Sequence, residues 1–419
     1  MSEPGLGLRR QTDVYLAGVR GVRQPVPFSF AKLESSAKRR MTREAYAYIA
    51  GGAGLEGTID ANRAAFDRRR IVPRMMRDVS DRDLSIELFG RRLPTPFLTA
   101  PIGVLELAHR DADVAVAKAA ASEDVPMIFS NQASRSMEDC AAVMGDAPRW
   151  FQLYWSTSND LVASFLSRAE ACGCDAIVVT LDTTMLGWRC RDLDLAYLPF
   201  AVGKGIAQYT SDPVFRSLLK PGKLEGGKPT LKGVRSMLEV NHAYPGGVFK
   251  NMRSGMAIAA VRTFLSIYSR PSLTWDDLPF LRERTKLPIL LKGIQHPEDA
   301  RLAVEHGVDG IVVSTHGGRQ VDGALGSLDS LPRVVAAVDG RIPVLLDSGI
   351  RGGADVFKAL ALGARAVLIG RPFVYGLALA GEEGVRSVLK NFAADLDLTM
   401  GLSGCRSIAE IGADNLETE

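Results

Sequence analysis

One histidine of this chain stands where a catalytic base would be expected. His316 ends a short apolar run and is followed by Gly317, Gly318 and Arg319. The two glycines allow a ligand to approach the backbone closely, and a histidine can exchange a proton near neutral pH. A lone histidine is more often structural than catalytic, but this position beside Arg319 favours a catalytic role.

Charged side chains end several other apolar runs. Lys292 and Asp182 each follow such a run, so the chain would place one histidine, one lysine, one aspartate and several arginines at run ends. The last two runs end in Gly349, Arg351, Gly370 and Arg371. Backbone amides and arginines at such positions are suited to hold an anion, and phosphate in particular. The polar residues therefore predict proton-transfer chemistry beside an anion site.

Eight short apolar runs must position these residues. They are rich in leucine and β-branched residues, as strands buried on both faces should be. The runs are Pro96–Gly103, Pro126–Asn131, Trp150–Trp155, Ala176–Asp182, Pro288–Gly293, Gly310–Gly317, Pro343–Gly349 and Ala366–Gly370. The clearest amphipathic helices between them are Asp113–Glu123, Asp160–Cys172, Pro297–Gly307 and Gly353–Gly363.

Strand and helix alternating to a count of eight predict an α/β fold of the (β/α)8 TIM-barrel type. A doubly wound open sheet is the main alternative, and no G-x-G-x-x-G motif after the first strand supports it. In a barrel the site lies at the C-terminal ends of the strands. Every polar residue named above would then reach the same rim.

The domain organisation follows from the same pattern. Residues 1–30, rich in Gly, Pro and Arg, predict an irregular N-terminal arm, and a helical segment runs from Phe30 to Phe66. Residues 31–419 would form one barrel domain. Residues 187–287 would be a long, lid-like loop insertion after the fourth strand. Within it, the tract Pro221–Thr230 could be disordered or a tolerated surface insertion, and we hold both equally open.

Composition excludes several classes of protein. The 419 residues carry a formal net charge of +3 and no dense Lys/Arg run, so we expect no nucleic-acid partner. Five irregularly spaced cysteines are not a disulfide framework and favour a reducing, cytoplasmic compartment. Cys172 and Cys174 lack companion ligands, so we expect no metal site. The first residues do not read as a secretory signal, and no apolar run is long enough for a membrane span.

The motifs PILLKG, IVVSTHGGRQ, LLDSGIRGGADVFKALALGA and IGRP resemble those of the FMN-dependent 2-hydroxy-acid oxidases and dehydrogenases. The resemblance extends from about Phe30 to Ile411. Within the family the chain looks closest to the lactate 2-monooxygenase branch. The segments VPRMMRDVSDRDLSIELFG, APIGV, LDTTMLGWRCRDLD, YTSDPVF and LKGIQHPEDARLAVEHGVDG carry that similarity.

The resemblance implies a role for each catalytic residue. His316 matches the base that takes a proton as the substrate is oxidised, and Asp182 matches the carboxylate that orients it. Lys292 matches the lysine beside the flavin, where a fixed cation stabilises the reduced, anionic ring. Tyr154 matches the tyrosine near the substrate oxygen.

The resemblance also implies the binding residues. Arg319, Tyr48 and Arg189 match the groups that hold the substrate carboxylate, a bidentate task suited to guanidinium. The residues implied for FMN are Ala100, Pro101, Ser130, Gln152, Thr180, Lys292, Ser314, Asp347, Gly349, Arg351, Gly370 and Arg371.

Four residues depart from the common family pattern or mark a branch. Thr315 replaces a usual Asn, and we expect its side chain to point away from the site. Gln132 stands where relatives often have an apolar or aromatic residue, which puts lactate itself in doubt as substrate. Cys190 stands where the closest branch has Pro, and we interpret it as a loop substitution. Gly103 replaces an Ala common among oxidases, as in the monooxygenase branch, or meets a need for close backbone approach.

The implied activity is oxidation of an (S)-2-hydroxy acid to the 2-keto acid with O2 as acceptor, followed by decarboxylation if the products stay caged. Alternatives are a plain oxidase that releases H2O2, a dehydrogenase that uses a quinone or carrier, a silent flavin-binding protein, and a sugar-phosphate barrel without flavin. The resemblance implies a homo-oligomer, a tetramer or octamer. The apolar stretch Met256–Tyr268 is short and contains Arg262, which argues against membrane docking.

Overall fold

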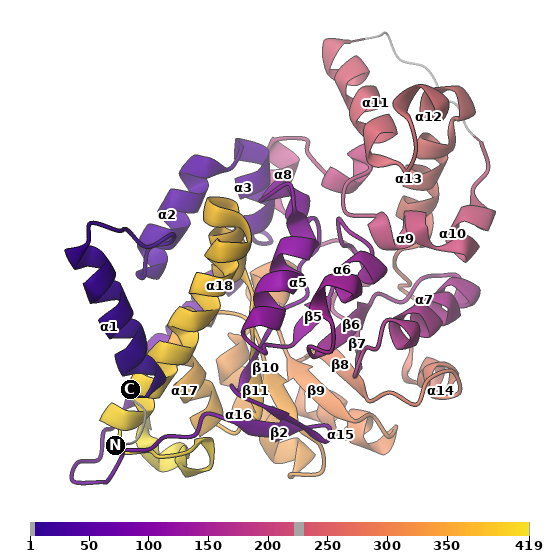
Figure 1. Cartoon of the computed structure of the whole chain (residues 1–419). Coiled ribbons are helices and arrows are strands. Elements are labelled where there is room, and N and C mark those ends of the chain that lie inside the picture. Colours follow the sequence, from indigo (N-terminus) through magenta and orange to yellow (C-terminus); the bar gives the residue numbers. More distant parts are fainter. Residues whose placement is uncertain (1–4, 222–229, 419) are drawn as a thin grey trace.

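The computed structural model of this chain describes residues 5–221 and 230–418. At its centre eight parallel strands form a closed barrel in the order β10-β11-β4-β5-β6-β7-β8-β9 (Figure 1). The barrel closes where Val367 of β11 lies opposite Phe97 of β4. This closure confirms the (β/α)8 prediction and rules out the open sheet. The strands are β4 (Phe97–Thr99), β5 (Met127–Phe129), β6 (Arg149–Leu153), β7 (Ile177–Thr180), β8 (Ile289–Ile294), β9 (Gly310–Val313), β10 (Val344–Leu346) and β11 (Ala366–Ile369).

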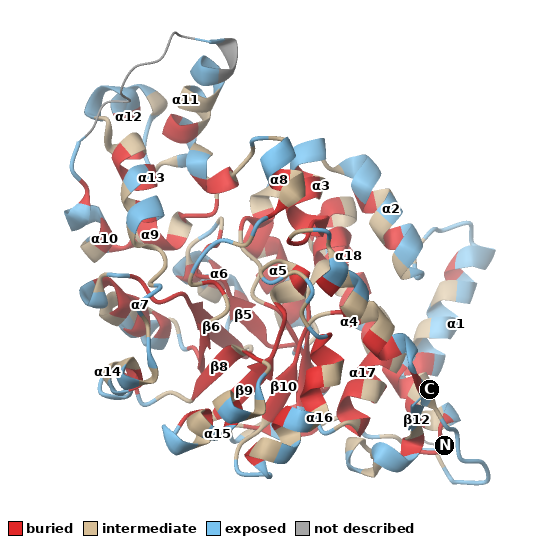
Figure 2. Ribbon diagram, turned by 180° about the vertical axis from the view of Figure 1, so that it is seen from behind, coloured by how far each residue is buried: buried red, intermediate tan, exposed pale blue. Residues whose placement is uncertain are grey.

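The strands are short and buried on both faces, as a parallel barrel requires (Figure 2). Side chains that point inward form a separate apolar cluster, which includes Leu98, Trp150 and Leu290. The antiparallel hairpin of β2 (Ile86–Leu88) and β3 (Arg91–Leu93) adds to this cluster. Its turn residue Phe89 meets Trp150 with ring centroids 5.7 Å apart. The hairpin thus closes the N-terminal end of the barrel and leaves the C-terminal end for a site.

One helix follows each strand on the outside of the barrel. The four clearest predicted helices agree with the observed ones to within two residues. Local signals start several of them: the Ser158 hydroxyl accepts the N–H of Leu161 at 3.3 Å, and Pro297 opens the first turn of its helix. The helices are α5 (Ala112–Ser122), α6 (Met137–Met144), α7 (Asn159–Ala171), α14 (Leu278–Arg282), α15 (Pro297–Glu305), α16 (Ser327–Val338), α17 (Gly353–Ala361) and α18 (Arg371–Leu402).

The N-terminal arm differs from the expectation of an irregular segment. Residues within 1–30 form α1 (Leu6–Val19), and the helical segment that follows consists of α2 (Phe30–Arg40), α3 (Arg43–Ala50) and α4 (Gly57–Asp67). α1 lies along α18, where the Gly7 N–H donates to Asp397 at 2.9 Å and Arg10 donates to Asn391 at 3.0 Å. Docking on a distant helix stabilises α1, which local sequence signals could not reveal. β1 (Arg69–Ile71), which follows α4, pairs antiparallel with β12 (Leu416–Thr418) near the C-terminus.

The insertion at 187–287 is a set of short helices and not an open loop. They are α8 (Cys190–Asp194), η2 (Pro199–Val202), α9 (Ala207–Ser211), α10 (Pro213–Leu218), α11 (Leu231–Ala243), α12 (Val248–Ser254), α13 (Met256–Ile267), η3 (Trp275–Asp277) and α14. Most of the tract Pro221–Thr230, for which disorder and a surface insertion were both open, lies outside the described residues, which exclude 222–229. The apolar stretch singled out for membrane docking forms α13, whose buried Phe264 packs against Tyr209 with centroids 4.8 Å apart. That apolar face is therefore turned into the protein.

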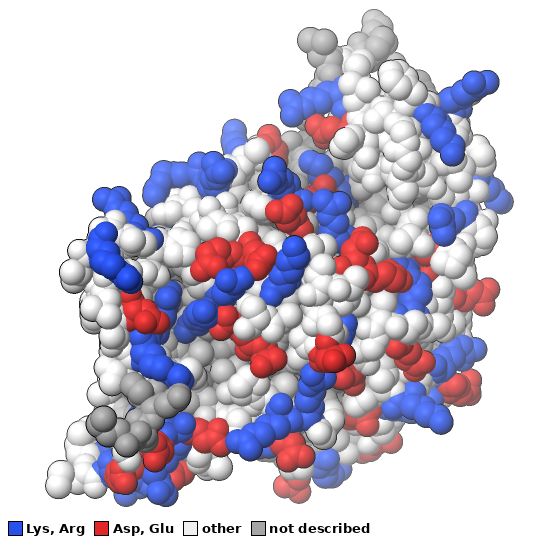
Figure 3. Space-filling model, viewed as in Figure 1, with Lys and Arg blue, Asp and Glu red and all other residues white. Residues whose placement is uncertain are grey.

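Basic and acidic side chains are interspersed over the lower part of the face seen in Figure 3, and basic ones predominate over its upper part. Among the residues that the structure describes, no helix has the length and apolar character needed to cross a membrane. All five cysteines are free. No group of three or more His, Cys, Asp or Glu side chains in the described ranges could hold a metal ion.

Candidate active site

A cavity of about 1060 Å³ opens at the C-terminal ends of the barrel strands. This volume includes space that is open to solvent. The predicted site residues on its wall are Tyr48, Ala100, Pro101, Tyr154, Arg189, Lys292, His316, Arg319, Asp347, Gly349, Arg351, Gly370 and Arg371. The remaining predicted residues, Ser130, Gln152, Thr180, Asp182 and Ser314, end the same strands but do not line the wall.

His316 is held in an unusual backbone conformation at the end of β9. Its φ is 55°, and Gly317 and Gly318 continue in the left-handed region at 65° and 76°. Hydroxyl groups hold this turn: Ser314 Oγ accepts the His316 N–H at 2.9 Å, and Ser348 Oγ accepts the Gly317 N–H at 2.9 Å. Strained backbone of this kind often occurs at functional sites. Here it turns the imidazole toward the cavity.

Asp182 fixes the orientation and tautomer of the imidazole. Its Oδ1 lies 2.8 Å from His316 Nδ1. Because a carboxylate only accepts hydrogen bonds, Nδ1 carries the proton and Nε2 keeps a free lone pair. Burial lowers the pKa of His316, although Asp182 acts in the opposite direction. Burial alone would raise the pKa of Asp182, but His316 and Lys292 outweigh it, so the pKa of Asp182 is lowered and its charge is retained.

Lys292 is a buried cation between two carboxylates. Its Nζ lies 3.1 Å from Asp347 Oδ2 and 3.9 Å from Asp182 Oδ2, and it donates to Ser314 Oγ at 2.8 Å. Burial would lower the pKa of Lys292, but the two carboxylates outweigh burial and raise it. The cavity wall therefore carries a permanent positive charge at this strand end.

Two arginines and a tyrosine stand beside His316. Arg319 Nη1 donates to the carbonyls of Tyr48 and Gly51, and its guanidinium lies 4.8 Å from the centroid of the Tyr48 ring. Arg189 Nε donates to the Arg319 carbonyl at 3.2 Å. Burial and the neighbouring Arg189 lower the pKa of Arg319. Because Arg189 and Arg319 are two positive charges held close together on a buried wall, they favour the binding of an anion in the cavity beside them.

Tyr154 completes this part of the wall. It is 8% exposed, and its backbone N–H is anchored to Asn131 Oδ1 at 3.1 Å. Burial, reinforced by the charge of Asp182, raises the pKa of Tyr154. Its hydroxyl therefore stays protonated and can donate a hydrogen bond to a ligand oxygen.

A second cationic corner lies where β10 and β11 end. Arg351 donates to the Ile350 carbonyl at 3.1 Å, and its guanidinium lies 4.2 Å from the Phe30 ring centroid. Arg371, the first residue of α18, donates to three backbone carbonyls and so retains two of its five N–H groups. Burial, and next the charge of Arg371, lower the pKa of Arg351. A helix N-terminus beside two arginines is suited to a phosphate group.

Unpaired polar groups test whether the residues fit FMN. Among the described residues, Gln152 Nε2 and Thr180 Oγ1 are buried without a hydrogen-bond partner. Ser130 Oγ and the Asn131 N–H both donate to Gln152 Oε1, at 3.4 and 3.1 Å, which leaves the Gln152 amide N–H groups free. Buried polar atoms without partners are costly and indicate a missing ligand. A polar-edged ring with a phosphate tail fits a site that has unpaired groups at the ends of β6 and β7 and a cationic corner at the ends of β10 and β11.

Several residues of the site could not be picked out from the sequence. Gln320 Nε2 donates to the carbonyls of Asp182 and Met185 at 2.7 and 2.8 Å, and its Oε1 accepts from Arg189 at 2.9 Å and from Gly187 at 3.4 Å. These four hydrogen bonds of the Gln320 side chain connect the segment after β9 to the loop after β7. In the sequence, the position of Gln320 directly after Arg319 is the one indication of this role.

The insertion also supplies cavity walls that sequence reasoning missed. Phe200 and Tyr268 of the insertion line the cavity, and so does Leu186, which directly precedes it. Phe200 meets the Tyr48 ring edge-on with centroids 6.3 Å apart. The segment therefore contributes to the site itself, and no local pattern marked these three residues.

The departures from the family pattern have structural explanations. The Thr315 side chain hydrogen-bonds to Asn62 at 2.9 Å and is absent from the cavity wall, as expected. A Cβ at Gly103 would lie 2.8 Å from the Gln132 carbonyl oxygen, so this position needs glycine for a close backbone approach. The approaching backbone is that of the β5 loop. Cys190 is the first residue of α8 and lies outside the cavity wall.

Comparison with known proteins agrees with this geometry. The family described as FMN-dependent dehydrogenase matches residues 37–418. The chain is 44% identical over 405 residues to the FMN-dependent alpha-hydroxy acid dehydrogenase qulF of Penicillium citrinum, which covers 96% of this chain and 94% of the relative. It is 44% identical over 384 residues to an L-lactate oxidase of Lysinibacillus sphaericus, with coverage of 92% and 91%. A crystal structure of mandelate oxidase with (S)-4-hydroxymandelic acid is similar, with a TM-score of 0.77, 38% identity and coverage of 94% and 99%.

Proposed function

This chain belongs to the FMN-dependent dehydrogenase family, and on that premise we propose that it oxidises an (S)-2-hydroxy acid to the 2-keto acid with O2 as the electron acceptor. FMN-dependent oxidation of 2-hydroxy acids is the activity common to its relatives. The observation that carries the proposal is the position of His316, oriented by Asp182 beside Arg189 and Arg319. This arrangement places a base next to two arginines that can bind the carboxylate of the substrate.

His316 acts as the base. Its unprotonated Nε2 takes the proton of the substrate hydroxyl, and Asp182 stabilises the imidazolium that results. Since burial lowers the pKa of His316, the ring is neutral and ready to accept a proton at neutral pH. Tyr154 donates to the substrate oxygen and keeps the alcohol in place.

Arg319, Arg189 and Tyr48 hold the substrate carboxylate. Arg319 uses only Nη1 to donate to backbone carbonyls. Its other N–H groups are therefore available for a bidentate contact with a carboxylate. Arg189 adds charge from the insertion side, where Gln320 holds it. This grip orients the alcohol carbon and excludes water from the reacting face.

When bound, FMN would supply the acceptor for the two electrons and the hydrogen of the alcohol carbon, which with the hydroxyl proton would reduce O2 to H2O2. Gln152, Thr180, Ser130 and the backbone at Ala100 and Pro101 would hold its ring. The ribityl chain and phosphate would be held by Ser314, Asp347, Gly349, Arg351, Gly370 and Arg371. Lys292 places a fixed positive charge beside the group that gains electrons.

Oxidative decarboxylation is a second candidate function, because the insertion contributes to the cavity. Leu186, Phe200 and Tyr268 enclose it and would delay escape of the products. A 2-keto acid held with H2O2 reacts to give a carboxylic acid one carbon shorter, CO2 and water. Gly103 is shared with the branch that carries out this reaction, yet its contact with Gln132 is a sufficient structural reason for glycine.

The test uses the purified holoenzyme, whose absorbance should show bound flavin. (S)-Lactate and larger (S)-2-hydroxy acids are added without air, and bleaching of the flavin is followed. Bleaching by a 2-hydroxy acid, and its loss in His316→Ala, are expected. Rapid recolouring in air identifies O2 as the acceptor, whereas slow recolouring would replace it with a quinone or carrier. One H2O2 and one keto acid per turnover would identify a plain oxidase and refute decarboxylation.

A further inference from the structure

The backbone of Gln132 is fixed at the end of β5. Its N–H donates to Ser130 Oγ at 3.1 Å, and its carbonyl accepts the Val104 N–H at 2.9 Å. Two glycines, Gly103 and Gly205, approach it so closely that a Cβ on either would lie 2.8 or 3.1 Å from its carbonyl oxygen. The loops after β4 and β5 and the insertion therefore grip this residue from several sides, and its Cα position is set before any ligand binds.

The side chain of Gln132 has no such partners. It lines the cavity and is 8% exposed, yet its amide makes no hydrogen bond with any residue that the structure describes. An amide carries two donor hydrogens and one acceptor oxygen. Neither amide atom is fully buried, so both are open to a ligand that enters the cavity.

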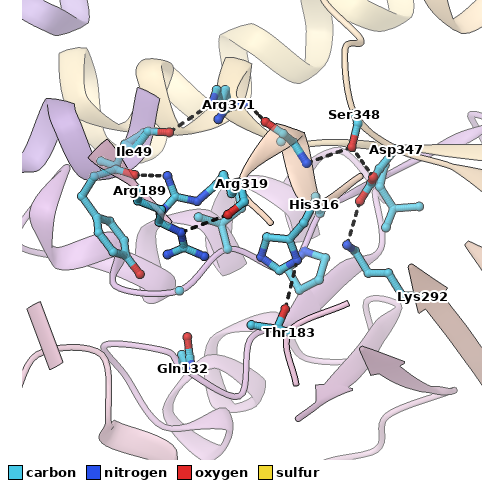
Figure 4. Close-up of a pocket in the computed structure, with 18 of the residues that line it drawn as sticks. Ile49, Gln132, Thr183, Arg189, Lys292, His316, Arg319, Asp347, Ser348 and Arg371 are labelled. Atoms are coloured by element: carbon cyan, nitrogen blue, oxygen red, sulfur yellow. Dashed lines mark hydrogen bonds and ion pairs between the residues drawn. The ribbon is translucent and has the colours of Figure 1, made fainter. Parts of the chain in front are cut away.

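The amide faces the reacting groups across the cavity. In Figure 4, Arg189, Arg319, His316 and Lys292 lie together on one side, and Gln132 lies opposite with its side chain directed into the intervening space. The carboxylate and alcohol of a 2-hydroxy acid would be engaged on the charged side, so the rest of the molecule extends toward Gln132. Phe200 adds apolar wall there, since a Cβ at Gly205 would touch both the Phe200 ring and the Gln132 carbonyl. The charged groups that Figure 4 labels all lie across the cavity from Gln132.

We propose that Gln132 forms a polar subsite that selects 2-hydroxy acids whose side chain carries an uncharged hydrogen-bonding group, such as a hydroxyl or a carboxamide. This inference rests on the proposed function. A substrate with a purely aliphatic side chain would be disfavoured, because it would bury the Gln132 amide without a hydrogen-bond partner. The fixed backbone of Gln132 would keep the amide from moving away. Lactate, with only a methyl group, would leave the subsite unfilled.

The experiment compares acids of equal shape and different polarity. (S)-Glycerate is paired with (S)-2-hydroxybutyrate, and (S)-2-hydroxysuccinamate with (S)-2-hydroxy-4-methylpentanoate. kcat/KM is measured for each with the holoenzyme and with Gln132→Met, which keeps the side-chain length. The polar member of at least one pair should be favoured by about tenfold, and Gln132→Met should remove that preference. Leu186→Met is the matched control: it alters the same cavity without adding or removing a hydrogen-bonding group and should leave the ratio within each pair unchanged.

Two results overturn the inference in distinguishable ways. If apolar members are used as well as polar ones, and Gln132→Met leaves the ratios unchanged, the subsite is wrong while the proposed oxidation stands. If no acid of either kind bleaches the flavin of the unaltered holoenzyme in the absence of air, the proposed function itself fails. Unchanged flavin absorbance in Gln132→Met excludes a folding defect as the cause of a lost preference.

Discussion

His316 Nδ1 lies 2.8 Å from Asp182 Oδ1, although 134 residues separate the two in the chain. One residue follows β9 and the other follows β7, and the barrel brings both strand ends to one rim. This contact prepares His316 to act as a base, because it keeps the ring proton on Nδ1 and leaves the lone pair of Nε2 free to accept a proton. It also joins Lys292 and Asp347 into one buried charge network.

Asp182→Asn should lower kcat by about 10²–10⁴-fold, because an amide no longer enforces the reactive tautomer or stabilises the imidazolium. The carboxylate acts to raise the pKa of His316 against the effect of burial, so its removal should also move the acid limb of the pH–kcat profile to lower pH. Thr183→Val, which removes a hydroxyl 3.4 Å from Nδ1, is the milder comparison. A kcat of Asp182→Asn within a few-fold of the parent would contradict the assignment.

Arg351→Ala should weaken FMN retention by about 10- to 150-fold, the value of one charge-assisted contact. Arg351 is the sharper probe of the phosphate corner because its side chain donates only to the Ile350 carbonyl, whereas Arg371 also ties three backbone carbonyls together. The dissociation constant is measured by flavin fluorescence during dialysis. Arg341→Ala, which loses contacts only to carbonyls of α16, controls for the loss of an arginine. Equal retention in both variants would place the phosphate elsewhere.

Arg319→Lys should raise KM by about 10-fold or more and change the limiting rate of flavin reduction less, because one ammonium cannot reproduce a two-pronged grip on a carboxylate. Stopped-flow reduction over a range of substrate concentrations separates the two quantities. A substrate affinity equal to that of the parent would argue against a carboxylate at Arg319. The cation–π contact with Tyr48 can be retained by lysine, so a folding effect should be small.

Gln320 should act as a positioning residue for Arg189 and the loop after β7. Gln320→Met removes all four hydrogen bonds, and we expect KM to rise by about 10-fold with a smaller change in kcat. Gln320→Glu still accepts from Arg189 and should restore much of the substrate affinity, although its carboxylate faces two carbonyls. A KM of Gln320→Met equal to that of the parent would contradict this role.

Asp113→Asn should stabilise the fold at alkaline pH. Burial raises the pKa of Asp113 from 3.8 to about 7, while its Oδ2 accepts the N–H groups of Ser134 and Arg135 at 2.9 and 3.0 Å. The folded state thus binds a proton more tightly than the unfolded chain, so the free energy of unfolding falls as the pH rises from about 4 to 7. Asparagine keeps the acceptor without the charge, and Tm should rise by roughly 2–4 °C at pH 8 and less at pH 5. A gain at pH 5 as large as at pH 8 would contradict this.

The sequence was sufficient for the barrel and for most of the site. Buried strands of a parallel barrel are nearly continuous apolar runs, so eight of them could be located from residue types alone. All their C-terminal ends meet at one rim. The polar residues that end them, His316, Lys292 and Asp182 among them, could therefore be placed together without knowing any contact.

Only the tertiary structure decided which residues complete that rim. α1 forms where residues near the N-terminus dock on α18, and Phe200 and Tyr268 reach the cavity because the insertion folds back over the barrel. Gln320 makes three hydrogen bonds to backbone atoms and one to the Arg189 side chain, all more than 130 residues away in the chain. The Gln132 backbone is fixed by the Val104 N–H and by the close approach of Gly103 and Gly205. Local periodicity carries no information about such partners, because pairing between distant segments is set by how the elements pack and not by the residues beside them.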